Sequence, residues 1–200
     1  MSSQEDLLTF WFGPVQDDGT ARDEVVARWW NKNDAFDAEC RARFLPSLDA
    51  AMVGRHDAWA RTPAGRTALI VLTDQLPRNV FRGTPRAFAT DALALEHSKR
   101  AVAAREHLQV PVCYGYFQLM PFMHSEALAD QERGVELFQE LTDHTPAGPA
   151  RASVAPAVDF AARHRDIVRR FGRFPHRNVI LGRDSSPDEL EFLTQPGSSF

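Results

Sequence analysis

Apolar residues recur along most of the chain at the three- and four-residue spacing of helices that pack on one side. The clearest run lies between Asn33 and Gly54, where four apolar side chains follow at intervals of four residues: Phe36, Cys40, Phe44 and Leu48. Positions four apart share one face of an α-helix, so the run predicts an amphipathic helix over this stretch. We expect a kink at Pro46, which lacks a backbone donor.

Helix start and stop signals separate the other apolar runs. Thr62-Pro63 and Thr84-Pro85 each place an N-cap threonine before a proline at the first helical position, and Ser186-Pro187 opens a last short helix. No segment alternates apolar and polar residues between hairpin turns. The pattern predicts an all-α chain of about eight or nine helices with no sheet.

One stretch interrupts this helical pattern. Residues 145–156 are rich in Pro, Ala and Gly, and we expect a mobile loop there. The segment that follows is too short and too basic to bury a core of its own. We therefore expect residues 1–200 to form a single domain, with a frayed tail at 194–200.

Composition and charge narrow the class of protein. With 44% hydrophobic and 25% charged residues, the chain has the composition of a folded globular protein. Its acidic start and short apolar runs indicate neither a secretory signal nor a membrane partner. Cys40 and Cys113 match no zinc or redox spacing, so we expect buried, reduced thiols in a cytoplasmic protein. A formal net charge of −4 disfavours a nucleic-acid partner.

The positive charge is unevenly distributed along the chain. Seven arginines and two histidines lie between residues 163 and 183, where Asp166 is the only acid. Only Lys32 and Lys99 are lysines, so a genome that favours arginine codons is the simpler explanation. The clustering nevertheless favours anion recognition, because a planar guanidinium binds carboxylate or phosphate through two hydrogen bonds.

Three short polar motifs, each next to a proline, carry the candidate chemistry. In the first, Asp74 and Arg78 lie four residues apart and Asn79 follows. Pro77 leaves the carbonyl of Thr73 without its usual donor, so we expect the helix to kink or end here. A salt bridge that ties a helix end explains the motif; substrate binding by Asp74, Arg78 and Asn79 is the functional interpretation.

The second motif places His124 and Glu126 shortly after Pro121, with Ser125 as the expected N-cap of the next helix. Carboxylates in a first helical turn complement the helix dipole, which is the structural interpretation. The functional interpretation makes His124 and Glu126 a catalytic acid/base pair. Because no His-Glu-x-x-His pattern or third ligand is present, we expect no metal and no other cofactor.

The third motif surrounds Pro175 with Arg173, His176, Arg177 and Asn178. Structural loops are built mainly from Ser, Asn, Asp and Gly, so this density of Arg and His exceeds what a connection requires. We interpret Arg173, Arg177 and Asn178 as a substrate-binding anion subsite, and His176 as a second candidate for catalytic proton transfer.

Motifs of this kind extend over nearly the whole chain. They include Phe10-Trp11-Phe12-Gly13, Trp29-Trp30, Asp74-Gln75-Leu76-Pro77-Arg78-Asn79, Phe88-Ala89-Thr90-Asp91, Met120-Pro121-Phe122-Met123-His124-Ser125-Glu126 and Phe171-Gly172-Arg173-Phe174-Pro175-His176-Arg177-Asn178. In these motifs the chain resembles the uncharacterised bacterial domain-of-unknown-function 924 family, which is grouped with the tetratricopeptide-like helical superfamily. The resemblance implies an array of antiparallel helix pairs and no particular activity. No repeat of about 34 residues is visible, so a peptide-binding groove does not follow.

We expect the three motifs to converge on one pocket for a small anionic metabolite. The converging side chains would be Asp74, Arg78, His124, Glu126, Arg173, His176 and Arg177. Acid/base hydrolysis or group transfer is the reaction class that these groups suit. The alternatives are a non-catalytic module that binds a peptide carboxylate through the same arginines, and a buried ion-pair network that fixes helix packing.

Overall fold

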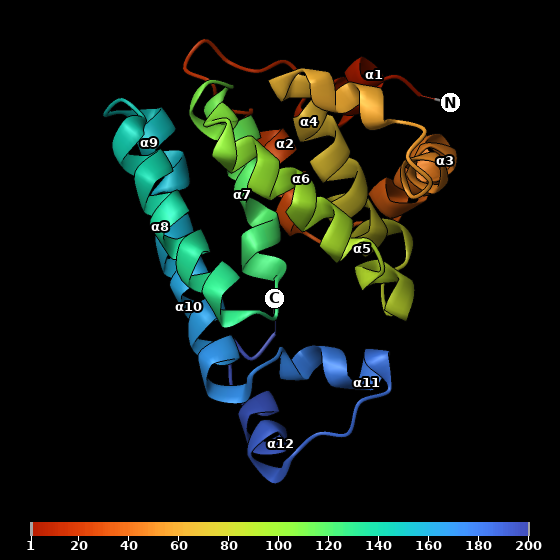
Figure 1. Ribbon diagram of the computed structural model, residues 1–200, viewed down its shortest axis with the longest axis vertical. Helices are drawn as coiled ribbons and strands as arrows, with labels where there is room; N and C mark the ends of the chain where they lie inside the picture. Colours follow the sequence, from red (N-terminus) through yellow and green to blue (C-terminus); the bar gives the residue numbers. More distant parts are fainter. Residues whose placement is uncertain (1, 200) are drawn as a thin grey trace.

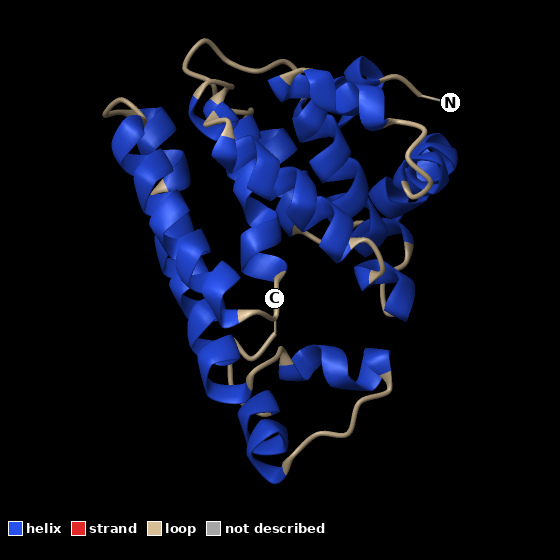
Figure 2. Cartoon of the chain, viewed as in Figure 1, coloured by secondary structure: helices blue, strands red, loops and turns tan. Residues whose placement is uncertain are grey.

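The computed structural model describes residues 2–199, and its regular structure is entirely helical over that range (Figure 2). The all-α prediction is confirmed. Of the twelve α-helical segments in the described chain, three (α5, α9 and α11) have six residues or fewer, which leaves nine longer helices. The segments are α1 (Gln4–Phe12), α2 (Asp23–Trp30), α3 (Asp34–Ala51), α4 (Pro63–Ile70), α5 (Leu76–Val80), α6 (Asp91–Ala103), α7 (Val112–His124), α8 (Leu128–His144), α9 (Pro149–Val154), α10 (Pro156–Phe171), α11 (Asn178–Leu181) and α12 (Pro187–Leu193). None of the described helices has both the length and the hydropathy needed to cross a membrane.

The helix starts follow the capping signals of the sequence. Thr62 accepts a hydrogen bond from the backbone of Gly65 and begins α4, with Pro63 at the first helical position. Asn33 caps α3 in the same way, and α3 continues through Pro46. Ser186 caps α12, and the carboxylate of Glu189 accepts a hydrogen bond from the backbone N–H of Ser186, which completes a capping box.

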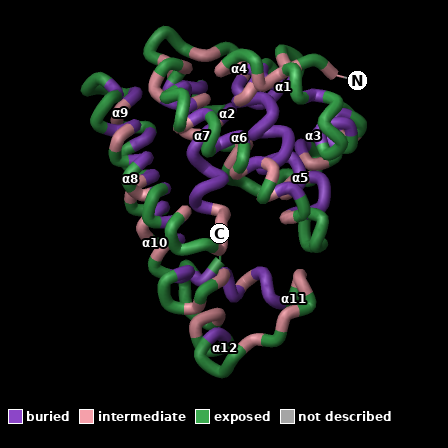
Figure 3. The backbone as a smooth tube through the Cα atoms, viewed as in Figure 1, coloured by how far each residue is buried: buried purple, intermediate pink, exposed green. Residues whose placement is uncertain are grey.

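Helix α7 is the centre of the fold. It is buried along almost its whole length (Figure 3) and packs against α4, α6 and α8. Phe117, in the middle of α7, has no exposed surface and contacts the rings of Trp11, Phe12 and Trp29. Such edge-to-face contacts orient α1 and α2 against α7.

Helices α8 and α10 run antiparallel and pack along their length (Figure 1). Glu132, near the start of α8, pairs with Arg169, near the end of α10, at 3.2 Å. A mobile loop over 145–156 is therefore wrong for most of that stretch, because α9 occupies Pro149–Val154 and α10 begins at Pro156. Both prolines stand at first helical positions, where a missing N–H costs nothing, and the alanines around them favour helix.

The chain beyond α10 forms a C-terminal segment, residues 172–199, whose helices α11 and α12 lie at the lower end of the molecule in Figure 1, while its last residues run back toward the middle of the view. Ile167, Val168 and Phe174 form a small apolar cluster of their own that holds it to α10. That residues 1–200 form a single domain stays a prediction.

The end of this segment, where a frayed tail is expected, contains one buried residue. Gly197 makes a turn with φ of 78°, Ser198 is buried, and its hydroxyl donates to the carbonyl of Leu193 at 3.2 Å. Glycine adopts that left-handed conformation without strain, which lets the chain fold back. Residues 194–197 and 199 are exposed, so the frayed tail stays a prediction, and Phe200 lies outside the described residues.

Candidate functional site

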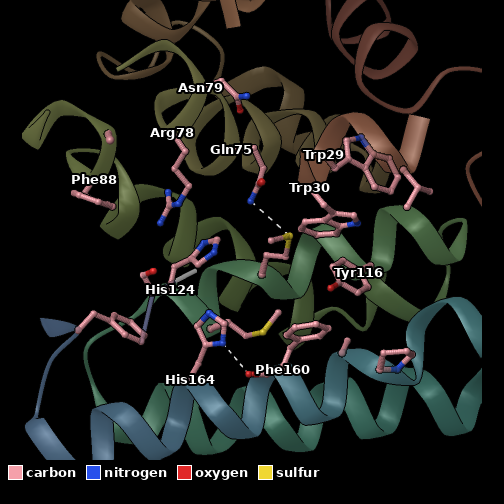
Figure 4. Close-up of a pocket in the computed structure, with 18 of the residues that line it drawn as sticks. Trp29, Trp30, Gln75, Arg78, Asn79, Phe88, Tyr116, His124, Phe160 and His164 are labelled. Atoms are coloured by element: carbon pink, nitrogen blue, oxygen red, sulfur yellow. Dashed lines mark hydrogen bonds between the residues drawn. The ribbon is translucent and has the colours of Figure 1, made fainter. Parts of the chain in front are cut away.

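A cavity of about 960 Å³ lies between α2, α5 and α7 on one side and α10 with the C-terminal segment on the other. Each of the three polar motifs contributes to its lining: Arg78 and Asn79, then His124, then His176 and Arg177. Figure 4 shows Arg78 and His124 toward one end, and Trp29, Trp30 and Tyr116 toward the other. The cavity therefore has a polar end and an aromatic end.

The polar end is built around Pro77. A π-helical turn, Val71–Gln75, joins α4 to α5, and the helix passes through Pro77 and ends three residues later, at Val80. Pro77 has no N–H to offer the carbonyl of Thr73, and the hydroxyl of Thr90 donates to that carbonyl at 2.5 Å instead. This hydrogen bond places the first residue of α6, Asp91, beside the first motif. Inserted π-turns recur at functional sites in other helical proteins.

Asp74 is the most deeply buried charged group at this end and has no exposed surface. Its carboxylate lies 2.7 Å from Nδ1 of His124 and 3.3 Å from Nη1 of Arg78, and it also accepts a hydrogen bond from Gln75. Burial alone would raise the pKa of Asp74, but His124 and Arg78 hold it at about 2. The carboxylate is therefore ionised at neutral pH.

His124 is the residue that this carboxylate orients. Burial, together with the nearby charge of Arg78, lowers the pKa of His124 below its ordinary 6.5, so the ring is neutral at pH 7. A neutral imidazole beside an ionised carboxylate donates through Nδ1, which leaves the lone pair on Nε2. The arrangement suits general-base chemistry toward the cavity that the ring lines.

The local structure at His124 differs from the expected helix start. His124 is the last residue of α7, and Ser125 is the C-cap of that helix, whereas Ala127 is the N-cap of α8. The prediction of Ser125 as an N-cap is wrong, because α7 accommodates Pro121 in its interior and continues for three more residues.

Two arginines approach Asp91 in unequal ways. Arg78 binds both carboxylate oxygens of Asp91, at 2.8 and 3.0 Å, while Arg177 reaches one of them at 3.4 Å. The guanidinium of Arg177 lies between the rings of Phe88 and Phe174, at 4.7 and 4.6 Å from their centroids. Its Nε has no hydrogen-bond partner within the described structure. Burial and the charge of Arg78 lower the pKa of Arg177 to about 10.

Glu126 does not line the cavity. It accepts a hydrogen bond from the backbone N–H of Phe174 at 2.8 Å and binds Arg183 through both oxygens, at 2.7 and 3.0 Å. Burial would raise the pKa of Glu126, but the hydrogen bonds from Arg183 and Phe174 lower it. Glu126 thus anchors the C-terminal segment and does not form an acid/base pair with His124.

Two of the proposed substrate-binding residues also face away from the cavity. Arg173 binds Glu189 through two hydrogen bonds, at 2.7 and 2.8 Å, and Asn178 donates to Ser185 while it accepts from Arg183. These contacts hold the turn that presents Arg177. Of the seven side chains expected to converge, only Arg78, His124, His176 and Arg177 line the cavity, and Asp74 lies behind them in contact with His124 and Arg78.

Two further histidines face the cavity from α10 and the turn after it. Burial lowers the pKa of His176 to about 4, with the charge of Arg177 adding to the effect. His164 donates from Nδ1 to the carbonyl of Phe160 at 2.7 Å, and burial lowers its pKa to about 3. Both rings are neutral at pH 7 and strongly resist protonation.

The lining does not favour metal binding or catalysis by a thiol. Within residues 2–199, no three His, Cys, Asp or Glu side chains gather as a metal-binding group. Cys113 lines the cavity, but burial raises the pKa of its thiol to about 12, so it is not an activated nucleophile.

Comparison with known proteins places the chain in a family. A bacterial family of unknown function, DUF924, matches residues 7–197. The chain belongs to this family. A solved structure of a protein of unknown function from Agrobacterium tumefaciens is similar, with 35% sequence identity, a TM-score of 0.79, and coverage of 95% of this chain and 96% of that one. No curated protein matches the chain. The tetratricopeptide-like arrangement stays a prediction.

Several groups in or beside the cavity of this DUF924 protein escaped the sequence interpretation. Asp91 and Phe88 lie in a matching motif but in none of the three polar motifs, and His164 lies outside all of these motifs. The signal for Asp91 was the unpaired carbonyl of Thr73, whose missing partner had to come from elsewhere in the chain. Trp29 and Trp30 also lie in a matching motif, and both line the cavity.

Proposed function

We propose that the cavity binds a small organic anion through Arg177, and that His124, oriented by Asp74, transfers a proton to or from the bound molecule. The observation that supports the proposal is that the buried positive charge of Arg177 has no close negative partner. Its side chain is only 7% exposed, and its one carboxylate contact is the 3.4 Å approach to Asp91. A buried charge without close partners is unfavourable, so an anionic ligand supplies what the site lacks.

The other arginines of the lining are already engaged. Arg78 binds Asp91 through two hydrogen bonds and lies near Asp74, and Arg82 binds Asp37 of α3 through two more. Arg177 alone combines deep burial with a lone, long contact in the lining formed by residues 2–199. Hydrogen bonds between a guanidinium and a carboxylate are strong where water is excluded, which favours binding here.

Proton transfer follows from the Asp74–His124 pair. The proton would move from the ligand, or from a water molecule that attacks it, to Nε2 of His124. Nδ1–H stays bonded to Asp74, whose negative charge stabilises the imidazolium that forms. Hydrolysis or group transfer on a carboxylated substrate is the reaction class that this pair supports.

The surroundings favour this function over the two alternatives. A peptide module would present an open groove, whereas Arg177 is buried and His124 is only 13% exposed in the lining of the cavity. An ion-pair network describes Glu126, Arg173 and Arg183 well, but it leaves Arg177 with poor partners. We place the protein in the cytoplasm, because the free thiols of Cys40 and Cys113 suit a reducing compartment.

The test is binding of organic anions to matched variants. We expect benzoate and short carboxylates to raise the melting temperature of the wild type, but not that of Arg177→Met. The control is Arg169→Met, which removes an exposed arginine of α10 with a comparable loss of charge. If carboxylates stabilise Arg177→Met as much as the wild type, the proposed anion site is wrong.

A further inference from the structure

We infer that the ligand is an amphiphilic monocarboxylate, whose apolar group, aryl or medium-chain alkyl, lies against the aromatic end of the cavity. This inference rests on the proposed function, because it takes Arg177 as the partner of the carboxylate. The aromatic wall, as we call it, consists of Trp29, Trp30, Tyr116 and Phe160.

The wall is assembled from three helices that are far apart in the sequence. Trp29 and Trp30 end α2, Tyr116 belongs to α7, and Phe160 comes from α10 on the other side of the cavity (Figure 4). The ring centroids of Trp29 and Trp30 are 6.2 Å apart at 83°, and those of Trp30 and Tyr116 are 5.9 Å apart. Rings in such orientations present both faces and edges to an apolar group.

The exposure of two wall residues indicates that the wall lacks an occupant. Trp30 is 51% exposed and Phe160 is 47% exposed, and no other aromatic side chain within residues 2–199 is as exposed as these two. Both line the same cavity from opposite sides. Exposed aromatic surface is unfavourable in water, and a ligand that covers both rings removes that surface from solvent.

The floor between the two ends is apolar and adaptable. Met120 and Met123 of α7 lie between the wall and His124, so a ligand that spans the cavity passes over thioether side chains. Methionine side chains are flexible and polarizable, and they accommodate apolar groups of different shape. This favours an alkyl or aryl group over a polar one such as a sugar.

The charge of the lining sets the charge of the ligand. No Asp or Glu of the described chain lines the cavity, which disfavours a cationic ligand even beside aromatic rings. Arg78 and Arg82 are held by Asp91 and Asp37, so Arg177 is left to match one negative charge. A monocarboxylate fits this balance, whereas a phosphate ester or a dicarboxylate brings a second charge that no free cation meets.

The experiment measures Kd by calorimetry for straight-chain carboxylates from acetate to octanoate. Each added methylene should strengthen binding about threefold to fourfold, the factor that corresponds to ~0.8 kcal/mol of transfer free energy, until the chain covers the wall. Suberate, which has the length of octanoate and a second carboxylate, should bind at least about tenfold more weakly than octanoate. Arg177→Met should weaken binding of every member.

Trp30→Ser and Phe160→Ser test the wall at two half-exposed positions, where substitution leaves the buried core intact. Each should weaken octanoate binding about tenfold or more and leave butyrate unchanged. Leu190→Ser is the matched control, because Leu190 is 57% exposed on α12 and does not line the cavity. It should change no affinity.

Three results overturn parts of this picture in distinguishable ways. Affinity that depends on Arg177 but not on chain length refutes the amphiphilic ligand and leaves the anion site standing. Length dependence that survives both Trp30→Ser and Phe160→Ser refutes the wall as the place of the apolar group. Carboxylate binding that ignores Arg177→Met, or no binding of any carboxylate, refutes the proposed function and this inference with it.

Discussion

Nδ1 of His124 lies 2.7 Å from Oδ1 of Asp74, a carboxylate that has no exposed surface. Burial and the charge of Arg78 lower the pKa of His124. We predict a neutral ring at pH 7, protonated at Nδ1, and a pKa below 6.5. Nitrogen-15 NMR of the imidazole distinguishes the two tautomers directly, and an Nε2–H tautomer, or titration above pH 6.5, would contradict the proposed general base.

Asp74→Asn should destabilise the protein even though it keeps the size of the side chain. The substitution removes the negative charge that Arg78 and His124 face in a buried place. Loss of one partner from a buried charge pair costs about 3 kcal/mol or more, which urea denaturation measures. Asp17→Asn, at an exposed turn, is the control and should change the free energy of unfolding by less than ~0.5 kcal/mol.

The two arginines beside Asp91 should respond differently to substitution by methionine. Arg78→Met leaves both Asp91 and Asp74 without their close cation, so we expect a loss of about 3 to 5 kcal/mol. Arg177→Met removes a poorly compensated charge and keeps the contact with two phenyl rings, so we expect a change within about 1 kcal/mol. Equal costs in urea denaturation would show that Arg177 is a structural residue.

Stability should fall on mild acidification. Burial holds the pKa of His164 at about 3 and that of His176 at about 4, below the ordinary 6.5, so the unfolded chain binds more protons than the folded one below pH 6.5. Their contribution is therefore complete above pH 6.5 and is lost as the pH falls toward 4. The buried acids Asp74 and Glu189 have pKa values of about 2, so they change the pH dependence of stability only below their unfolded pKa values near 4.

Denaturation in urea between pH 7 and 4.5 measures this loss. We expect at least about 2 kcal/mol, given 1.36 kcal/mol for each unit of pKa shift. His164→Gln should reduce the dependence on pH, because glutamine can still donate to the carbonyl of Phe160, while His144→Gln at an exposed position should not. A flat profile in the wild type would contradict the buried, neutral histidines.

Thr90 and Pro77 should be coupled through the carbonyl of Thr73. Thr90→Val removes the hydroxyl that donates to this buried carbonyl and should cost about 1 to 2 kcal/mol. In the background of Pro77→Ala, which restores a backbone N–H, the same substitution should cost at least ~0.5 kcal/mol less. A double-mutant cycle in urea tests this, and strictly additive costs would refute the compensation.

The first motif shows how far a sequence pattern reaches. The spacing of Asp74 and Arg78 predicts their ion pair, which is confirmed. Pro77 predicts that the carbonyl of Thr73 lacks its usual backbone donor, and a side chain, Thr90, donates to it instead. The pattern does not identify the donor that satisfies this carbonyl. Thr90 lies 17 residues further along the chain, and its approach depends on how the two segments pack. Asp91, which binds Arg78 closely and Arg177 only at 3.4 Å, was missed for the same reason.

The third motif shows where the pattern fails. Arg173 and Arg177 stand four residues apart around a proline, yet Arg173 turns to Glu189 and Arg177 turns to the cavity. The density of polar residues indicates that these side chains form polar contacts, but it does not identify their partners. The reason is that a short 3₁₀ turn points neighbouring side chains in different directions. Glu126 likewise found its partner in Arg183, beyond the motif.

The contact between Arg177 and Asp91 joins positions 86 residues apart. During folding, the two sides of the cavity therefore meet only when the two ends of this long stretch of chain are brought together, which is slow and costs conformational entropy. A ligand that touches both sides must leave before the C-terminal segment can detach. Occupancy should then slow the rate of unfolding, so that resistance to a protease over time reports a bound ligand even where equilibrium stability changes little.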